Sequence, residues 1–251
     1  MNLMGKDGDI TLRPVALFRS PFSSKFGIPR QSGVVEELEG RVVFAPGFRR
    51  PEALTGLEGF DFIWLVWGFS GNEGRWQMTV RPPRLGGNRS VGVFASRSPF
   101  RPNGLGLSSV RLERIDFDSA DGPVLVVKGA DLMDGTPIYD VKPYVAYSDS
   151  HPGVRSGYTD GIGWREAEVV FPGELERKFL KLVSAGVAGT DGQAGAENGD
   201  ALKALTKTLA QKPVPQYQHN PDRVYGMPFM GCDVRFRVDG DRVIVSDIVK
   251  L

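Results

Sequence analysis

Arginines gather in one stretch of the chain, residues 75–101, which reads RWQMTVRPPRLGGNRSVGVFASRSPFR. The stretch contains no acidic residue, although the whole chain has 31 basic and 30 acidic residues. Because an arginine guanidinium makes paired hydrogen bonds with phosphate or carboxylate, we expect this stretch to bind an anionic group. The competing interpretation is a solvated surface loop with incidental ion pairs. The arginines are Arg75, Arg81, Arg84, Arg89, Arg97 and Arg101.

Proline and glycine interrupt this arginine-rich stretch, so it cannot form one long helix. They occur as Pro82-Pro83, as Gly86-Gly87 and, just beyond the stretch, as Pro102 with Gly104. A short apolar run at residues 91–95 predicts a strand between two basic loops. We therefore expect the arginines to lie on loops that a rigid β scaffold holds in place.

The bulk composition limits the classes of protein to which the chain can belong. Its 251 residues, 41% of them hydrophobic, suffice for one large or two small domains with a buried core. The net charge of +1 excludes nucleic-acid binding by overall charge alone but allows a local basic face. The sequence has no Gly-rich nucleotide loop and no His beside a nucleophile, which disfavours the familiar hydrolase and nucleotide-binding folds.

Cysteine and histidine are too few for a disulfide or a recognised metal site. Cys232 is the single cysteine, and His151 and His219 are the only histidines, so no metal-ligand set has a recognised spacing. No apolar run reaches the roughly 18 residues of a membrane span, and residues 1–9 lack the apolar segment of a signal peptide. We therefore expect a cytoplasmic, metal-free protein that does not enter a membrane.

The first 150 residues are expected to be mainly β. Short apolar and β-branched runs, separated by Gly, Pro and Asp, predict a series of strands with little helix. The most apolar run, residues 60–69, is expected to be a central strand. We therefore predict a closed or sandwiched β domain over residues 8–150. The other predicted elements are strands at residues 10–18, 41–44, 107–117 and 123–128, the last two as a hairpin, and one helical turn at residues 51–57.

The C-terminal part is expected to be a small α+β domain over residues 160–251, which a Ser-, Gly- and Asp-rich linker at residues 148–163 precedes. Leucines at helical spacing predict a helix over residues 200–211 with Asp200 as its N-cap. Asp239-Gly240, between two β-branched runs, is the clearest hairpin signal in the chain. The remaining predicted elements are a strand at residues 164–171, a helix at residues 173–183 and the hairpin strands at residues 234–238 and 243–248.

Six short motifs occur in a fixed order along the chain. They are residues 18–21 (FRSP), 25–31 (KFGIPRQ), 81–88 (RPPRLGGN), 92–98 (GVFASRS), 100–103 (FRPN) and 134–137 (DGTP). In this order they resemble the TsaA-like family, whose two-domain bacterial members are the TrmO-type tRNA N6-methyltransferases. The resemblance extends to the predicted hairpin strand at residues 234–238 and so covers nearly the whole chain.

The resemblance implies a fold and a function. The fold is an N-terminal β-barrel that binds S-adenosyl-L-methionine without a Rossmann sheet, followed by a C-terminal domain that recognises the tRNA. The reaction is methylation of N6 of N6-threonylcarbamoyladenosine at position 37 of tRNA. The resemblance also implies a homodimer with its sites near the subunit interface.

The resemblance further implies which residues bind the cofactor, and the sequence identifies no general base. The cofactor is expected to contact Ser32, Gly33, Val34, Ser70, Gly71, Arg97, Leu107, Asp134, Gly135, Thr136 and Pro137. From the charge of the arginine-rich stretch we hypothesise that Arg81, Arg84 and Arg101 hold the anionic substrate. The other expected tRNA contacts are Arg30, Asn88 and Tyr217. Residues 212–217 read KPVPQY where the family has Asp-Pro-Arg-Pro before a Tyr, so we expect tRNA recognition at this segment to differ.

Other interpretations of the same residues remain open. On composition alone, residues 134–137 are a turn whose Asp accepts backbone hydrogen bonds. The arginine-rich stretch could serve a noncatalytic RNA-binding protein, which would have no affinity for S-adenosylmethionine. It could also serve a phosphate-directed hydrolase of nucleotides, although no nucleophile, metal set or acid pair accompanies the arginines.

Overall fold

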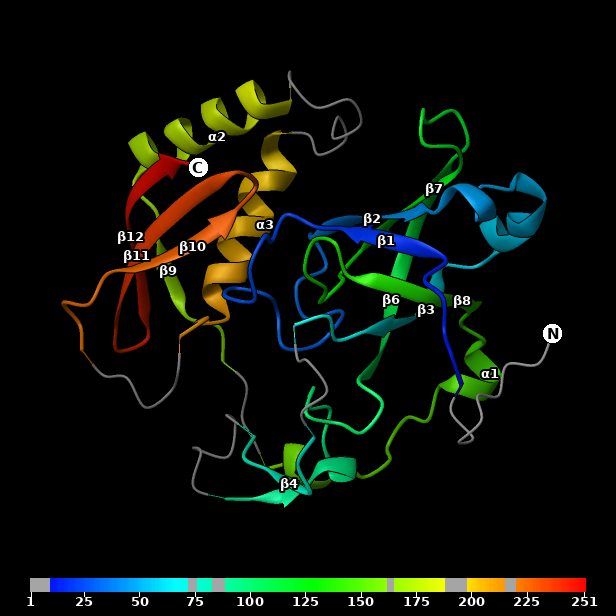
Figure 1. The fold of residues 1–251 in the computed structure, drawn as a ribbon. Helices are drawn as coiled ribbons and strands as arrows, with labels where there is room; N and C mark the ends of the chain where they lie inside the picture. Colours follow the sequence, from blue (N-terminus) through cyan, green and yellow to red (C-terminus); the bar gives the residue numbers. More distant parts are fainter. Residues whose placement is uncertain (1–9, 72–75, 83–88, 162–164, 188–197, 215–219) are drawn as a thin grey trace.

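The structure, a computed structural model, describes residues 10–71, 76–82, 89–161, 165–187, 198–214 and 220–251. Figure 1 shows a barrel of strands from the first part of the chain beside a second sheet, which two helices from the last part accompany. The mainly β architecture predicted from the sequence is confirmed.

Six strands close the barrel in the order β1-β2-β7-β6-β3-β8. Every neighbouring pair is antiparallel, including the β1–β8 pair that closes the ring. Full closure leaves no barrel strand with an unpaired edge. The strands are β1 (Ala16–Arg19), β2 (Glu39–Phe44), β3 (Phe62–Gly68), β6 (Leu105–Asp116), β7 (Val124–Lys128) and β8 (Pro137–Pro143).

The barrel core forms because alternate side chains of each strand point inward. In β3, Ile63 and Leu65 are fully buried, whereas Phe62 is exposed. The run at residues 60–69 is a central strand, as predicted, because β3 pairs with β6 on one side and β8 on the other. The predicted hairpin at residues 107–128 is also confirmed as β6 and β7.

The strand predicted at residues 91–95 is shorter than expected and is not part of the barrel. Val91–Gly92 forms the two-residue strand β5, which pairs with β4 (Thr79–Val80) in a separate small sheet. Val93–Ala95 then turns into a 3-10 helix. Two residues of strand are too few to join the barrel, and the nearby Pro and Gly residues, which the sequence shows, end the run early.

The C-terminal part combines a four-stranded sheet, in the order β10-β11-β12-β9, with two helices. The hairpin at Asp239-Gly240 is confirmed, and Gly240 has a φ of +55°, which suits a tight turn. The sheet contains β9 (Glu168–Val170), β10 (Tyr225–Phe229), β11 (Cys232–Asp239) and β12 (Arg242–Lys250), and the helices are α2 (Gly173–Val187) and α3 (Asn198–Ala210).

Two details of this part differ from the sequence-based expectations. Helix α3 begins at Asn198, so Asp200 lies in its first turn and is not the N-cap. Strand β10 was not predicted, because Gly226 and Pro228 interrupt its apolar residues. Short elements elsewhere are α1 (Ala146–Asp149) and 3-10 turns at Pro46–Phe48, Pro51–Leu54, Leu57–Gly59 and Gly157–Thr159.

The loop between β1 and β2, residues 20–38, joins the two parts of the molecule. Its side chains Phe22, Val35 and Leu38 are buried in the core of the C-terminal sheet and helices, separate from the barrel core. The backbone N–H of Met230 donates to the Pro21 carbonyl at 2.9 Å. The C-terminal part therefore fixes a loop that belongs to the barrel. Within the described residues, no helix is long and apolar enough to cross a membrane.

Candidate active site

Three loops leave the barrel at the same end. In the antiparallel ring, the ends of β1, β3 and β7 lie beside the starts of β2, β6 and β8, as the pairs Arg19–Arg41, Gly68–Leu105 and Glu39–Lys128 show. The loops at residues 20–38, 69–104 and 129–136 therefore emerge side by side. Nearly all of the predicted ligand contacts lie on these loops, which the strand order alone brings together.

Two glycines hold the first loop against the third. The N–H of Gly33 donates to the Gly129 carbonyl at 2.8 Å, and the N–H of Gly129 donates to the Leu38 carbonyl at 2.9 Å. Both glycines have positive φ, +77° for Gly33 and +76° for Gly129, a conformation that other residues rarely adopt. The predicted cofactor segment Ser32–Val34 therefore lies directly beside residues 129–131.

Asp131 is the buried acid at this junction. Its Oδ1 accepts a hydrogen bond from Ser108 Oγ at 2.6 Å, and Ser108 Oγ accepts one from the buried Trp67 Nε1 at 3.0 Å. The Ser32 backbone N–H also bonds to the Asp131 carboxylate. Burial raises the pKa of Asp131 above its ordinary value, and the Ser108 bond and the Arg97 charge oppose that rise.

Arg97 connects the second loop to this junction. Its Nη1 donates to Gln31 Oε1 on the first loop, and its positive charge lies close enough to Asp131 to act on the pKa of that carboxylate. Gln31, Ser32, Arg97 and Asp131 therefore form one polar cluster to which all three loops contribute. Such a cluster holds flexible loops in a single arrangement.

The turn at residues 134–137 is tied to the first loop. Asp134 Oδ1 accepts from the Ser20 N–H at 3.1 Å, and the N–H of Gly135 donates to the Phe18 carbonyl at 2.8 Å. Asp134 Oδ2 also lies 3.6 Å from Arg19 Nη1. Thr136 is buried, and its hydroxyl donates a hydrogen bond to the Met133 carbonyl. The interpretation of residues 134–137 as a turn whose Asp accepts a backbone hydrogen bond is thus confirmed. The Asp134 side chain nevertheless stays 38% exposed and can still meet a ligand.

A cleft of about 260 Å³ opens at the same barrel end, and Ser70, Arg101 and Pro137 lie on its walls. The cleft therefore brings the predicted cofactor residues Ser70 and Pro137 together with the predicted substrate residue Arg101. Arg101 Nη1 donates to the carbonyls of Ser96, at 2.6 Å, and of Val93, at 3.3 Å, which fixes its position at the rim. Asn103 and Tyr139 add further polar groups to the cleft.

Lys25 closes the gap between the first loop and the start of the second. Its Nζ donates to the Gly71 carbonyl at 3.0 Å, and a Cβ added at Gly71 would lie 2.7 Å from the Lys25 side chain. A residue larger than glycine at this position would therefore displace Lys25. The contact with Lys25 thus fixes Gly71, an expected cofactor residue, beside the first loop.

Other predicted residues lie farther out. Leu107 points away from the barrel core, is 54% exposed and lies opposite Val66 of β3. Arg81 is exposed, and Arg30 is partly buried. Arg84, Asn88 and Tyr217 lie outside the described residues. Lys212, which begins the atypical segment, donates from Nζ to Asp241 at 2.6 Å and to the Gly240 carbonyl at 2.9 Å, so it supports the β11–β12 turn.

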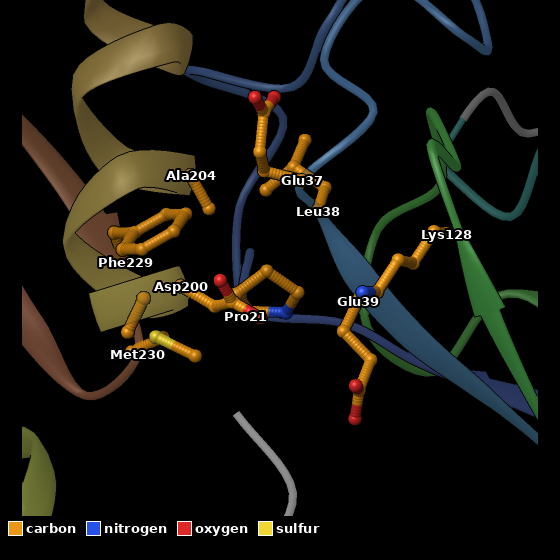
Figure 2. A pocket seen from close by; sticks show the side chains of 10 residues that line it. Pro21, Glu37, Leu38, Glu39, Lys128, Asp200, Ala204, Phe229 and Met230 are labelled. Carbon is orange, nitrogen blue, oxygen red and sulfur yellow. The ribbon is translucent and has the colours of Figure 1, made fainter. Parts of the chain in front are cut away.

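A second, much smaller pocket lies between the first loop and helix α3 (Figure 2). Its volume is about 10 Å³, which is room for one water molecule at most. Pro21 and Leu38 line it on the loop side, and Ala204 and Phe229 line it on the C-terminal side. It is a packing defect between two tightly joined parts, not a ligand site. Among the described residues, no group of three or more His, Cys, Asp or Glu side chains could hold a metal ion.

Comparison with known proteins gives the chain a family. The tRNA-methyltransferase O N-terminal domain matches residues 17–150, and the TrmO C-terminal domain matches residues 179–251. A relative from Escherichia coli strain K12, named tRNA (adenine(37)-N6)-methyltransferase, is 35% identical over 89% of this chain and 91% of its own. A solved structure titled "Crystal structure of TrmO" superposes with a TM-score of 0.74 at 31% identity.

That superposition covers 96% of this chain and 99% of the solved one. A TrmO structure from Pseudomonas aeruginosa covers the same shares with a TM-score of 0.72 at 29% identity. The similarity therefore extends over both the barrel and the C-terminal sheet in one arrangement. The chain belongs to the tRNA-methyltransferase O (TrmO) family.

Proposed function

We propose that the chain transfers a methyl group from S-adenosyl-L-methionine to N6 of the adenosine at position 37 of tRNA. The observation that carries this proposal is the nearly full-length similarity to the E. coli relative that is named for this reaction. Relatives from Pseudomonas aeruginosa and Pyrococcus abyssi are also named for the cofactor, the first as a methyltransferase that depends on it and the second as a protein that binds it.

The residues at the barrel end fit this cofactor. S-adenosylmethionine has a carboxylate, an ammonium group and an adenine, and the three loops offer partners for each. Arg97 supplies a fork for a carboxylate, and the partly exposed Asp134 supplies an acceptor for an ammonium group. We assign the adenine to the backbone of Ser32–Val34, which the bond from Gly33 to Gly129 fixes. Ser70, Gly71, Leu107 and residues 135–137 complete the proposed cofactor contacts.

When bound, the cofactor supplies a methyl carbon that its sulfonium already activates, so no covalent enzyme intermediate is needed. The residues of this chain have to align the substrate nitrogen with that carbon and exclude other orientations. Correct positioning alone contributes roughly 7 to 11 kcal/mol to the lowering of such a barrier. The polar cluster around Asp131 and the rigid turn at residues 134–137 supply this rigidity. Solvent can accept the proton that leaves N6.

We infer that the natural substrate is N6-threonylcarbamoyladenosine at position 37. The threonyl carboxylate and the anticodon-loop phosphates are anionic, and residues 75–101 of the second loop include six arginines and no acidic residue. Arg101, at the rim of the cleft, is one proposed substrate contact of the barrel. The others are Arg30, Arg81, Arg84 and Asn88. In this proposal residues 8–150 form the catalytic domain, and residues 160–251, through Tyr217, recognise the tRNA.

The proposal includes a homodimer in the cytoplasm. Exposed apolar side chains on the outer barrel wall, Leu107 and Phe62 among them, offer a surface that a second subunit would cover. The proposed substrates, tRNA and free S-adenosylmethionine, both occur in the cytoplasm, where a chain with one buried cysteine keeps its thiol reduced.

Calorimetry with S-adenosylmethionine and with its demethylated product tests the cofactor half of the proposal. We expect saturable binding of both ligands with one site per chain. Absence of binding would favour the noncatalytic RNA-binding alternative. Methyl transfer to tRNA that carries N6-threonylcarbamoyladenosine, compared with the same tRNA without the threonylcarbamoyl group, tests the substrate half.

Arg84→Ala separates substrate recognition from cofactor binding. The variant should bind the cofactor as the parent chain does but should bind tRNA more weakly. Its tRNA affinity should also depend less on salt, by about one phosphate's share. Arg50→Ala, at the opposite end of the barrel, is the matched control. Unchanged tRNA binding and activity in Arg84→Ala would refute the assignment of this arginine.

A further inference from the structure

A small arm extends from the barrel between β3 and β6. It consists of residues 76–82 and 89–101, and Figure 1 shows its strand β4 at the edge of the molecule, away from the C-terminal sheet. The pairs Thr79–Gly92 and Val80–Val91 hold its two sides together. The N–H of Val93 donates to the Met78 carbonyl at 3.0 Å, and the N–H of Gln77 donates to the Phe100 carbonyl at 3.1 Å.

The arm leaves three large apolar side chains in solvent. Trp76 is 52% exposed, Met78 is 78% exposed and Phe94 is 76% exposed, whereas the small Val80 and Val93 are buried. The bond between Val93 and Met78 places Met78 next to the residue that precedes Phe94. The arm is thus a folded element that presents an apolar surface, and an exposed group of large apolar side chains indicates a binding surface.

The same arm has exposed arginines as well as this apolar surface. Arg81, Arg89 and Arg97 are exposed on the arm, and residues 75–101 contain no acidic residue. Neither Arg81 nor Arg89 makes an ion pair with any residue that the structure describes. A partner of the arm is therefore expected to carry negative charge beside flat apolar groups.

Arg101 links the arm to the cleft. Its guanidinium carbon lies 6.0 Å from the centre of the Phe94 ring, within cation–π range, and the same side chain lines the cleft. Its bonds to the Val93 and Ser96 carbonyls fix the 3-10 turn that carries Phe94. The apolar surface and the candidate active site are thus neighbours that share one arginine.

We propose that the arm binds the unpaired nucleotides next to the adenosine that enters the cleft. Trp76 and Phe94 offer faces on which bases stack, Met78 fills the space beside them, and Arg81 and Arg89 contact the phosphates. Proteins that bind single-stranded nucleic acid commonly combine stacking of bases on aromatic side chains with contacts from basic side chains to phosphates. This inference rests on the proposed tRNA methyltransferase function and names the surface that holds the loop of the substrate.

A second copy of the chain is the other occupant that could cover the arm. A twofold interface brings the same patch of two subunits together, so the arginines of one arm would lie in the same interface as the arginines of the other. Like charges opposite one another disfavour such an interface. The charge of the arm therefore favours RNA over a second copy.

Fluorescence anisotropy with an anticodon stem-loop RNA tests the proposal. Trp76→Ala and Phe94→Ala should each raise the dissociation constant by about tenfold, since loss of one stacking contact has an effect of this size. Trp76→Phe keeps an aromatic face and should stay within about threefold of the parent chain. Phe117→Ala removes a 49% exposed ring at the other end of the barrel and should not change the affinity.

Two companion measurements separate the possible outcomes. Tryptophan fluorescence should be quenched when the RNA binds to the parent chain, and the quenching should be smaller in Trp76→Phe. Unchanged RNA affinity in both alanine variants would overturn the inference. A change of oligomeric state in those variants, by sedimentation, would also overturn it, because the arm would then contact a second copy. Failure of the proposed function would look different, since the parent chain itself would not bind S-adenosylmethionine.

Discussion

The loop at residues 20–38 and the arm leave the same end of the barrel but are held in opposite ways. The loop buries Phe22, Val35 and Leu38 in the core of the C-terminal part. The arm keeps Trp76 and Phe94 in solvent. In our proposals the loop is therefore a structural element that presents backbone atoms to the cofactor. The arm is proposed to present its side chains to RNA.

This difference predicts how substitutions in the two regions will act. The loop is ordered because burial of its apolar side chains offsets the conformational entropy lost on folding. Substitutions there should reduce both the free energy of unfolding and cofactor affinity. Substitutions of exposed residues on the arm should leave the stability nearly unchanged and affect RNA binding.

Phe22→Ala should have the largest effect. Phe22 is 1% exposed, and its ring makes an edge-to-face contact with Phe229 at 5.2 Å between centroids. Removal of a buried Phe ring costs about 3 to 5 kcal/mol in free energy of unfolding. Urea unfolding measures the loss, with Phe94→Ala on the arm as the control, which should change the stability by less than about 0.5 kcal/mol. Equal losses in the two variants would contradict the comparison.

Gly129→Ala should have the next largest effect, on both stability and cofactor affinity. Gly129 has a φ of +76°, and an added Cβ would lie 3.4 Å from the Gly33 backbone. The left-handed conformation alone costs an alanine roughly 1 to 2 kcal/mol. A backbone shift that relieves this strain would disturb the hydrogen bond from the Gly33 N–H to the Gly129 carbonyl, and with it the proposed cofactor segment. Urea unfolding and calorimetry with S-adenosylmethionine measure the two effects.

Gly59→Ala is the matched control for that substitution. Gly59 has no positive φ, and an added Cβ there meets no atom within 4 Å. The control should therefore keep the parent chain's cofactor affinity. If Gly129→Ala binds the cofactor as tightly as Gly59→Ala does, the cofactor is not seated on the first loop.

Much of the fold could be predicted from the sequence, because its strongest signals are local. The run that forms β3 is apolar throughout, and the turn at Asp239-Gly240 specifies a hairpin by itself. The error at residues 91–95 has a physical cause, since a short apolar run has the same composition in a barrel strand as in a strand that ends in a 3-10 turn. Only tertiary pairing distinguishes the two.

The candidate site was less predictable, because its organising residue lies in no motif. Asp131 stands between Ala130 and Leu132, just after the buried strand β7, and a lone acid in such a setting is a signal that could have been noticed. Its partners Ser108 and Ser32 are far from it in sequence. Only closure of the barrel brings them together, so spacing along the chain could not identify the cluster.

Asp131→Asn should have a smaller effect on stability than Gly129→Ala, and that effect should depend on pH. Burial raises the pKa of the Asp131 carboxyl above its ordinary 3.8. The folded state therefore prefers the protonated acid, and its contribution to stability is full below pH 3.8 and is lost as the pH rises through the raised pKa. The variant, which has no carboxyl to ionise, should gain stability relative to the parent chain over that pH range.

Urea unfolding at several pH values measures this trend. Below pH 3.8 the two chains should differ by no more than about 1 kcal/mol, because asparagine has the size of a protonated aspartate and can accept the Ser108 hydrogen bond. A difference that stays constant with pH would mean that the Asp131 carboxylate is well solvated. Asp118→Asn, in the exposed turn between β6 and β7, is the control and should show no such trend.

Arg89→Ala should have the smallest effect on stability and still alter RNA binding. Arg89 is exposed and makes no ion pair with a described residue, so its loss should change the free energy of unfolding by less than about 0.5 kcal/mol. If Arg89 contacts one phosphate of an unpaired strand, the slope of log affinity against log salt should become less negative by about 0.7. Anisotropy titrations with the anticodon stem-loop RNA at several salt concentrations measure that slope.

Arg50→Ala is the control, because Arg50 is an exposed arginine at the far end of the barrel, and this variant should keep the parent slope. Equal slopes in the parent chain, Arg89→Ala and Arg50→Ala would mean that this charged residue of the arm does not contact the RNA. The arm would then differ from the loop in the exposure of its side chains but not in function.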